Sequence, residues 1–286
     1  MVATPIGNLE DISVRALRVL REVPLIAAED TRRTAKLLSS HGIATPTVSF
    51  HSHNARSRVP ELVRRLELGD DVALVSDAGT PGISDPGLEL VEACLHRGIA
   101  VDPIPGPSAP LAAAVASGFP LDCLTIMGFC PSRGASRASF LRTLSALPGA
   151  ATFFESPHRI RRTVEELGIF LGSRQICIAR ELTKVHQEFL RGPADAISAS
   201  TIAERGEFTI VIGPKTDSAV RSEPLSDVDI LLSFNRISKS LGASSRRQAV
   251  SSTAAELGLS QREVYAAIER AKNSGEQHND DTHNEL

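Results

Sequence analysis

Short apolar runs alternate with amphipathic stretches along the first 118 residues of the chain. The run at residues 72–75 is bounded by turn-forming residues and predicts a buried strand, and residues 88–95 carry apolar side chains at helical spacing. The same alternation predicts strands over residues 1–3, 25–28, 47–50, 72–75 and 100–104, and helices over residues 12–21, 31–41, 56–66, 88–95 and 109–117. This order is typical of a parallel α/β sheet covered on both faces by helices.

A second α/β unit follows the turn-forming sequence at residues 118–122, which marks a domain boundary. Its apolar runs predict strands over residues 123–128, 152–155 and 176–181, shorter antiparallel strands over 188–191 and 208–212, and helices ending near 147, over 156–171 and near 194–203. We therefore expect an N-terminal α/β domain at residues 1–118 and a second α/β domain at residues 119–214.

The C-terminal part of the chain has a different pattern. A polar linker is expected at residues 214–224, and residues 245–257 and 261–272 predict two helices, the second opened by a capping box of Ser260 and Glu263. We expect a small helical extension at residues 225–275 and a disordered acidic tail at residues 276–286. The pair resembles a helix–turn–helix with Arg262 and Arg270 on the second helix, but a helical hairpin that enters no groove fits the pattern as well.

The composition is that of an ordinary globular protein of 286 residues, 42% of them hydrophobic. No apolar run reaches the ~20 residues that span a bilayer, and the N-terminus lacks the basic and apolar regions of a signal peptide. The cysteines at positions 94, 123, 130 and 177 are scattered, which predicts free thiols rather than metal ligands or disulfides. We therefore expect a cytoplasmic protein with no membrane partner.

The net charge of −3 argues against indiscriminate binding to nucleic acid. The segment from Glu276 to Leu286, however, contributes four acids and no Lys or Arg, so it masks basic surface elsewhere. Solvated helix faces account for most arginine clusters, and charge alone therefore favours RNA binding only weakly. The chain has no Trp and one Tyr, which argues against a sheet that stacks bases on paired aromatic residues. The arginine clusters are Arg56, Arg58, Arg64 and Arg65; Arg133, Arg137 and Arg142; and Arg159, Arg161 and Arg162.

The loop at residues 76–87, Ser-Asp-Ala-Gly-Thr-Pro-Gly-Ile-Ser-Asp-Pro-Gly, connects the strand at 72–75 to the next helix, which we expect Asp85 to cap. Open α/β sheets bind ligands at this end of their strands, where glycine lets the backbone approach a ligand and proline holds the loop in shape. Similar loops at residues 3–8 and 104–109 predict one shared ligand crevice, although any one of them alone also fits a purely structural connection. The chain has neither a G-x-G-x-x-G fingerprint nor a Walker A motif.

Polar side chains also collect where other strands end, at residues 29–32, 53–54, 77, 155–159 and 181–184. Salt bridges to neighbouring arginines explain such clusters about as well as a catalytic role does. His51 and His53 share one face of a predicted strand, but no further ligands are arranged near them, so we expect no metal site. The sequence at 156–158 lacks the glycines of a nucleophile elbow, and no Ser-His-Asp set is recognisable.

Several motifs carry a family resemblance. They occur in order from Val2 to about Gly213 and read Val-Ala-Thr-Pro-Ile-Gly-Asn-Leu at 2–9, Ala-Ala-Glu-Asp-Thr-Arg at 27–32, the loop at 76–87, Pro-Gly-Pro-Ser at 105–108, Phe-Glu-Ser-Pro-His-Arg at 154–159 and Ala-Arg-Glu-Leu-Thr-Lys at 179–184. Together they resemble the ribosomal small-subunit methyltransferase I family of the tetrapyrrole methylase superfamily. The resemblance implies a homodimer in which each chain has two α/β domains of the class III methyltransferase type, with S-adenosylmethionine (SAM) in the cleft between them. It also implies methyl transfer to the ribose 2′-oxygen of a cytidine in the decoding region of 16S ribosomal RNA, within the small ribosomal subunit.

The resemblance assigns roles to individual residues. Those expected around SAM are Pro5, Asp77, Gly79, Thr80, Pro81, Gly82, Ile83, Ser108, Ala109, Leu182 and Thr209, with the strand end at Glu155 beside them. The Gly79–Ile83 backbone is expected to form one wall of the site, so that a branched side chain at Gly82 abolishes SAM binding. We expect RNA to contact Arg32, His53, Asn54, Arg56, Arg133 and Arg159.

The reaction needs a proton acceptor or very good positioning. A ribose hydroxyl is a poor nucleophile until its proton leaves, and a general base adds roughly 10²–10⁴-fold to the rate. Glu155 and His158 lie three residues apart where a strand passes into a helix, and both are candidates for this base, with Lys184 able to stabilise the developing alkoxide. Two alternatives stay open: Glu155 only pairs with Arg159 to hold the loop, or positioning alone supplies the rate.

Two other functions compete with RNA methylation. A small-molecule methyltransferase acting on a tetrapyrrole shares the implied fold, but the first loop here reads Thr-Pro-Ile-Gly-Asn rather than the G-x-G-P-G-D form of those enzymes. A non-enzymatic, nucleic-acid-binding regulator built on the C-terminal helix pair is the second alternative. Removal of residues 224–286 separates it from an enzyme, because an enzyme keeps SAM binding.

Overall fold

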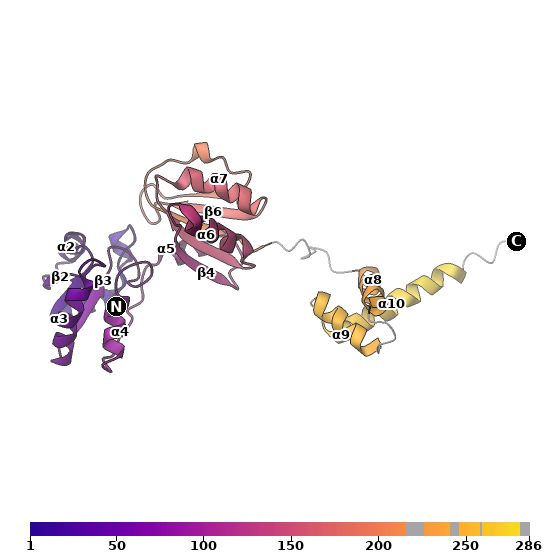
Figure 1. The fold of residues 1–286 in the computed structure, drawn as a ribbon, viewed down its shortest axis with the longest axis horizontal. Coiled ribbons are helices and arrows are strands. Elements are labelled where there is room, and N and C mark those ends of the chain that lie inside the picture. The colour runs from indigo at the N-terminus through magenta and orange to yellow at the C-terminus, as the bar shows by residue number, and fades with distance from the viewer. Residues whose placement is uncertain (216–225, 241–245, 258, 281–286) are drawn as a thin grey trace. The chain divides into compact units, whose positions relative to one another are not determined.

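The computed structural model describes residues 1–215, 226–240, 246–257 and 259–280. The chain forms two units, Met1–Lys215 and Thr216–Leu286. The larger unit holds two β-sheets, and we call the parts around them the first lobe (residues 1–107) and the second lobe (residues 108–215) (Figure 1).

The first lobe is built on a three-stranded parallel sheet in the order β2-β1-β3. Along β1, Ile26 and Ala28 pack against α1 and α2, whereas Leu25 and Ala27 pack against α3 and α4, because successive strand residues point to opposite faces. Helices thus cover both faces of the sheet, as predicted. Its elements are α1 (Val14–Glu22), β1 (Leu25–Ala28), α2 (Thr31–Ser40), β2 (Thr47–Ser49), α3 (Ala55–Glu67), β3 (Val72–Val75) and α4 (Leu88–Leu95), preceded by a 3₁₀ turn (Leu9–Asp11).

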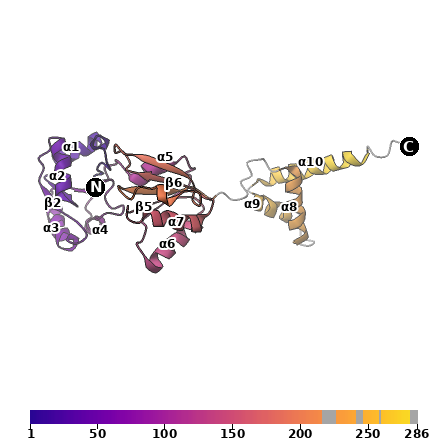
Figure 2. The same cartoon turned by 90° about the horizontal axis from the view of Figure 1, so that it is seen from above.

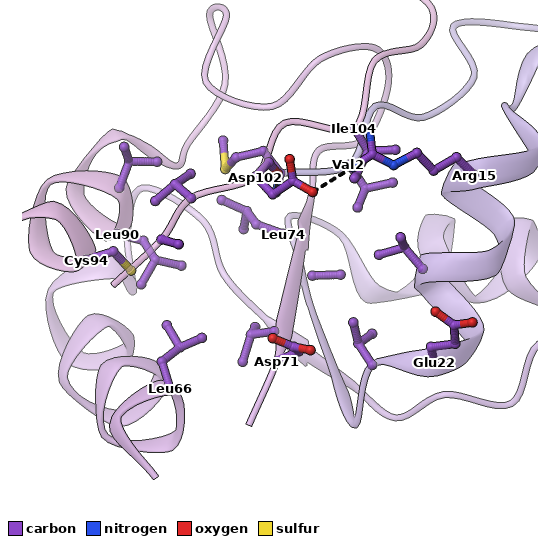
Figure 3. Close-up of a pocket in the computed structure, with 18 of the residues that line it drawn as sticks. Val2, Arg15, Glu22, Leu66, Asp71, Leu74, Leu90, Cys94, Asp102 and Ile104 are labelled. Carbon is purple, nitrogen blue, oxygen red and sulfur yellow. Dashed lines mark hydrogen bonds and ion pairs between the residues drawn. The ribbon is translucent and has the colours of Figure 1, made fainter. Parts of the chain in front are cut away.

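The predicted strands at residues 1–3 and 100–104 are reduced to a single parallel bridge between Val2 and Ile104. The Val2 N–H donates to the Leu74 carbonyl of β3 at 2.9 Å. Thr4 then bridges Gly79 in the opposite sense, which ends the pairing. A cavity of about 350 Å³ lies beside this bridge, between α1, β3 and α4 (Figure 3). The regular sheet therefore ends at β3, and this cavity lies away from the loops at the carboxyl ends of the strands.

The second lobe contains a five-stranded mixed sheet in the order β4-β5-β8-β6-β7. β4 and β5 are parallel and the other neighbours are antiparallel, which confirms the predicted direction of β7 and β8. Helices α6 and α7 cover one face and α5 covers the other (Figure 2). The elements are α5 (Ala109–Ser117), β4 (Leu124–Phe129), α6 (Gly134–Ala146), β5 (Ala150–Glu155), α7 (Ile160–Leu171), β6 (Gln175–Arg180), β7 (Glu188–Pro193) and β8 (Phe208–Ile212).

Two details of this lobe differ from the sequence expectations. Helix α5 packs on the second sheet, where Ala113 shares a buried cluster with Cys177 and Val211. The division between the sheets therefore lies before α5, not after it at residue 118. The helix predicted near residues 194–203 is only a 3₁₀ turn, Ala199–Thr201. Hydroxyl groups compete with helical hydrogen bonds there, since the Thr201 side chain donates to the Ser198 carbonyl at 2.8 Å.

The smaller unit is described as three helices, α8 (Asp227–Ser240), α9 (Arg246–Leu257) and α10 (Gln261–Asp280). They enclose a cluster that includes Phe234, Val250 and Ile268. The predicted helix pair and the Ser260–Glu263 capping box are confirmed, whereas α8 was not predicted. Helix α10 also runs through residues 276–280, where disorder was expected; residues 281–286 and linker residues 216–224 lie outside the described part. None of the described helices is long and apolar enough to cross a membrane.

Candidate active site

Loops of both lobes enclose a cavity of about 380 Å³ within Met1–Lys215. The first lobe contributes residues that follow β1 and β3, and the second lobe contributes the end of β5, the residue after Glu181 and the start of β8. The crevice predicted from the loop sequences is therefore present between two sheets. The lining residues are Ile6, Glu29, Arg33, Asp77, Ala78, Gly79, Thr80, Ile83, Ser84 and Asp85 on one side, and Ser108, Ala109, Pro110, Phe129, Phe154, Glu155, Ser156, Pro157, Leu182, Gly206, Glu207, Phe208 and Thr209 on the other.

Most of the residues expected around SAM meet at this cavity, although they come from four separate stretches of sequence. Those that line it are Asp77, Gly79, Thr80, Ile83, Ser108, Ala109, Leu182 and Thr209; Pro5, Pro81 and Gly82 do not. A Cβ on Gly82 would approach Met1 Cε (3.6 Å), away from the cavity wall. Only part of the Gly79–Ile83 segment therefore forms the wall, and Gly79 is the glycine that faces it.

The loop at residues 76–87 is held in an unusual backbone conformation. Gly79 has a φ of 83° and exchanges hydrogen bonds with Thr4 at 2.8 and 3.0 Å, which joins two of the predicted ligand loops. Ser84 also has a positive φ, 66°, a conformation that residues with a side chain rarely adopt. Helix α4 begins after Gly87, so the prediction that Asp85 caps this helix is wrong. Asp85 lines the cavity instead.

The first-lobe side of the cavity is acidic. Glu29 Oε2 accepts a hydrogen bond from the Asp77 N–H at 3.1 Å, and Asp77 pairs with Arg33 at 3.4 Å. Asp85 has its pKa raised to about 6, chiefly because burial disfavours its charged form and further because the Glu29 and Asp77 carboxylates lie near; a hydrogen bond from Ser76 opposes the shift. Asp85 was not among the residues expected at the site, because its place before a helix indicated a cap.

Glu155 lines the cavity and is fully buried in a network of polar groups. Its Oε1 accepts from the Ser156 N–H and from Arg159 Nε, both at 2.7 Å. Its Oε2 accepts from Thr163 Oγ1 at 2.6 Å and pairs with the buried Arg137 at 3.4 Å. Both oxygens are thus occupied. A general base needs a free lone pair, so this geometry favours the alternative in which Glu155 holds the strand end in place.

The other two catalytic candidates, unlike Glu155, do not line the cavity. His158 is exposed and is not among the lining residues. Lys184 Nζ is bound by Glu181 at 2.8 Å and Glu207 at 3.0 Å, so its charge is already neutralised. The spacing of Glu155 and His158 predicted that both side chains face the crevice. In the structure Glu155 lines the cavity and His158 does not.

Comparison with known proteins decides the family. Residues 1–198 match the family model described as Tetrapyrrole (Corrin/Porphyrin) Methylases. The chain is 48% identical over 217 residues to ribosomal RNA small subunit methyltransferase I of Thermotoga maritima, covering 75% of this chain and 97% of that protein. It is 41% identical over 271 residues to the protein of the same name from Halalkalibacterium halodurans, covering 93% and 92%. The chain belongs to the tetrapyrrole methylase family, on its ribosomal RNA small subunit methyltransferase I branch.

Two solved structures share the fold. Diphthine synthase aligns with a TM-score of 0.58 at 15% identity, covering 74% of this chain and 88% of that one. Uroporphyrin-III C-methyltransferase from Thermus thermophilus, solved with S-adenosyl homocysteine, aligns with a TM-score of 0.53 at 17% identity, covering 74% and 95%. This tetrapyrrole methylase is a SAM-dependent enzyme, and the missing glycine fingerprint agrees with a fold other than the Rossmann type.

The chemistry of the cavity fits SAM. Carboxylates at Glu29 and Asp77 suit a ligand that carries a positive sulfur and a positive amino group. The opposite wall is largely apolar and includes Phe129 and Phe154, whose rings are 5.0 Å apart and suit a flat base. The cavity therefore has acidic groups on its first-lobe side and apolar surface on the opposite side.

The residues expected to contact RNA divide into two groups in this methylase. Arg32, His53, Arg56 and Arg133 are exposed, Arg32 with a salt bridge to Asp30 at 2.7 Å. Asn54 instead accepts from the His51 N–H and donates to the Ser49 carbonyl, which holds the turn before α3. Arg159 is bound to Glu155 at 2.6 Å. Asn54 and Arg159 therefore have structural partners, and the exposed residues are the better candidates for phosphate contacts.

Proposed function

We propose that this methylase transfers the methyl group of SAM to the ribose 2′-oxygen of a cytidine in the decoding region of 16S ribosomal RNA, within the small ribosomal subunit in the cytoplasm. The observation that carries the proposal is the 41–48% identity to proteins named ribosomal RNA small subunit methyltransferase I over 92–97% of their length. The motifs that carry the resemblance also meet at the cavity between the lobes.

The residues around the cavity have simple tasks in such a reaction. SAM, when bound, supplies a methyl carbon activated by a positive sulfur. The 77–83 loop, Ser108, Leu182 and Thr209 would hold it, and the rest of the cavity mouth would guide the ribose so that its oxygen approaches in line with the carbon–sulfur bond. Positioning of this kind supplies a large part of a rate enhancement, about 7–11 kcal/mol at best.

The direct test is methyl transfer to small ribosomal subunits isolated from cells that lack this protein. Purified protein and SAM should place one methyl group on a ribose of the decoding region, located by mapping the 2′-O-methylated positions. A tetrapyrrole incubated in parallel serves as the competing substrate. Methylation of the tetrapyrrole with no ribose methylation would contradict the proposal.

A shortened chain tests the regulator alternative. The larger unit, Met1–Lys215, contains the whole cavity, so a chain ending at Lys215 should keep the SAM affinity of the full protein in calorimetric titration. A regulator built on α9 and α10 would instead lose its function when these helices are removed. Its full-length chain would show no SAM-dependent methyl transfer.

We expect the RNA to lie across both lobes, with its phosphates near exposed arginines such as Arg56 and Arg133. Replacing Arg56 or Arg133 with alanine should weaken RNA binding and lower its dependence on salt concentration by about one unit of slope each, with SAM affinity unchanged. Arg97 is the matched control, because it follows α4 and pairs with Glu67, near the opposite ends of the strands. Salt slopes that are the same in all three variants would make Arg56 and Arg133 ordinary solvated surface.

We propose further that the protein is a homodimer. Supporting this, α5 packs one face on the second sheet while Leu111 and Val115 on its other face are 51% and 72% exposed. Light scattering should give a mass of about twice 30.5 kDa, and Val115→Glu should shift it toward the monomer. A wild-type protein with the monomer mass at micromolar concentration would contradict the proposal.

A further inference from the structure

The carboxylates that line the active-site cavity differ in how many partners they have. Glu29 accepts a hydrogen bond from the Asp77 N–H, and Asp77 is held by the Asp30 N–H and by Arg33. Across the cavity, Glu155 is saturated, as described above, and Glu207 pairs with Lys184. Each of these acids therefore has a cation or a backbone N–H bound to it.

Asp85 is the exception. Among the described residues, no arginine or lysine forms an ion pair with it, and its one hydrogen-bonding neighbour is the Ser76 hydroxyl. It is half-buried and lines the cavity. The left-handed backbone at Ser84 and the helix start at Gly87 place Asp85 in the loop rather than in the cap of α4. Strained backbone of this kind persists only where the surroundings enforce it.

We propose that Asp85 is the general base of the methyl transfer. The proposal rests on the proposed function, because it assigns the proton of the ribose 2′-hydroxyl to an Asp85 carboxylate oxygen. As the 2′-oxygen forms its bond to the methyl carbon, the carbon–sulfur bond breaks with its electron pair left on sulfur, and the hydroxyl proton passes to Asp85. The proton leaves to solvent afterwards, which regenerates the carboxylate.

The charges around Asp85 suit this role. The charged groups that line the cavity together with Asp85 are Glu29 after β1, Arg33 on α2 and Asp77 after β3, with Glu155 and Glu207 contributed by the second lobe. Arg33 is paired with Asp77, so the balance near Asp85 is negative. Burial raises the pKa of Asp85 to about 6, with a further contribution from the Glu29 and Asp77 carboxylates. This makes Asp85 a stronger proton acceptor than an ordinary carboxylate while it stays ionised at neutral pH.

The first test compares Asp85→Asn with wild type under single-turnover conditions. The variant should transfer methyl groups at least tenfold more slowly, with SAM affinity within about threefold of wild type. The wild-type rate should rise with pH and level off above about pH 6, and the variant should lose this inflection. Glu89→Gln, four residues along the chain on exposed helix surface, is the matched control and should keep the wild-type rate.

A second readout does not depend on activity. In the folded protein Asp85 releases its proton near pH 6, against 3.8 for an ordinary aspartate, so ionising it disfavours folding increasingly as pH rises from about 4 through 6. Asp85→Asn removes this penalty, and its unfolding temperature should exceed that of wild type by more at pH 8 than at pH 5. Titration of ¹³C-labelled aspartate should show the elevated signal in wild type and not in the variant.

The outcomes separate the two proposals. A wild-type rate in Asp85→Asn, with ribose methylated by both proteins, would overturn the role of Asp85 and leave the proposed function standing. An Asp85 that titrates near pH 4 would overturn it as well. A wild-type protein that methylates no ribose would overturn the proposed function itself and, with it, the general base.

Discussion

Replacing Glu155 with alanine should lower the free energy of unfolding by about 3–5 kcal/mol, the usual cost of leaving a buried charge without its partner. Arg137 is 2% exposed and pairs with both Glu155 and Glu166, and Arg159 loses its nearest carboxylate in the variant. The Ser156 N–H loses its acceptor as well, and the Thr163 hydroxyl keeps only the Arg159 carbonyl, at 2.9 Å. Urea unfolding of the variant and wild type measures this difference directly.

The control for Glu155 is Glu165→Ala, an exposed acid on α7 of the same lobe, which should change stability by less than about 0.5 kcal/mol. Because Glu155 positions the strand end, its loss should weaken SAM binding and thermal stability together with the rate. A variant that folds with wild-type stability and SAM affinity but transfers methyl groups more than tenfold more slowly would restore Glu155 as a catalytic base.

Replacing Gly7 with alanine should reduce SAM affinity at least tenfold. A Cβ at this position would lie 2.6 Å from Lys184 Cγ and 2.7 Å from both the Leu182 carbonyl oxygen and Thr183 Oγ1. Gly7 belongs to the first lobe and these atoms to the second, so the two lobes must move apart around the cavity that they enclose. Overpacking of this kind costs about 1–3 kcal/mol of stability, and calorimetry with SAM measures the loss of binding.

Gly192→Ala is the matched control for Gly7, because the added Cβ would meet only Ile197 at 3.6 Å, an ordinary contact. It should bind SAM as wild type does. If Gly7→Ala also bound SAM normally, the contact between Gly7 and the loop at residues 181–184 would not set the width of the cavity.

The fold was predictable where a single stretch of sequence contains the whole signal. The alternation of apolar residues located β1, β3 and the helices around them, because strand and helix periods differ. Helix α5 was assigned to the wrong sheet because its small apolar residues fit either one, and the choice depends on contacts with β8 and β6. The helix predicted near residues 194–203 failed because hydroxyl side chains there bind the backbone locally.

The candidate site was predictable as a place, but less so residue by residue. The loop motifs identified the strand ends that meet at the cavity. Spacing alone could not show that Arg137 on α6 forms an ion pair with Glu155 at the end of β5. That contact depends on how α6 packs beside β5. Nor could it show that Ser84 takes a left-handed conformation that leaves Asp85 in the loop. Both cases depend on tertiary contacts that local sequence does not encode.

The contact between the lobes has a consequence for how the cavity opens. Thr183, with a φ value of 63°, lies on the second-lobe side of this contact, and its Oγ1 accepts a hydrogen bond from the Asn8 N–H at 3.0 Å. Each left-handed residue stores about 1 kcal/mol or more. A ligand that touches both lobes adds its own binding energy to this contact and so favours the arrangement in which the cavity is enclosed.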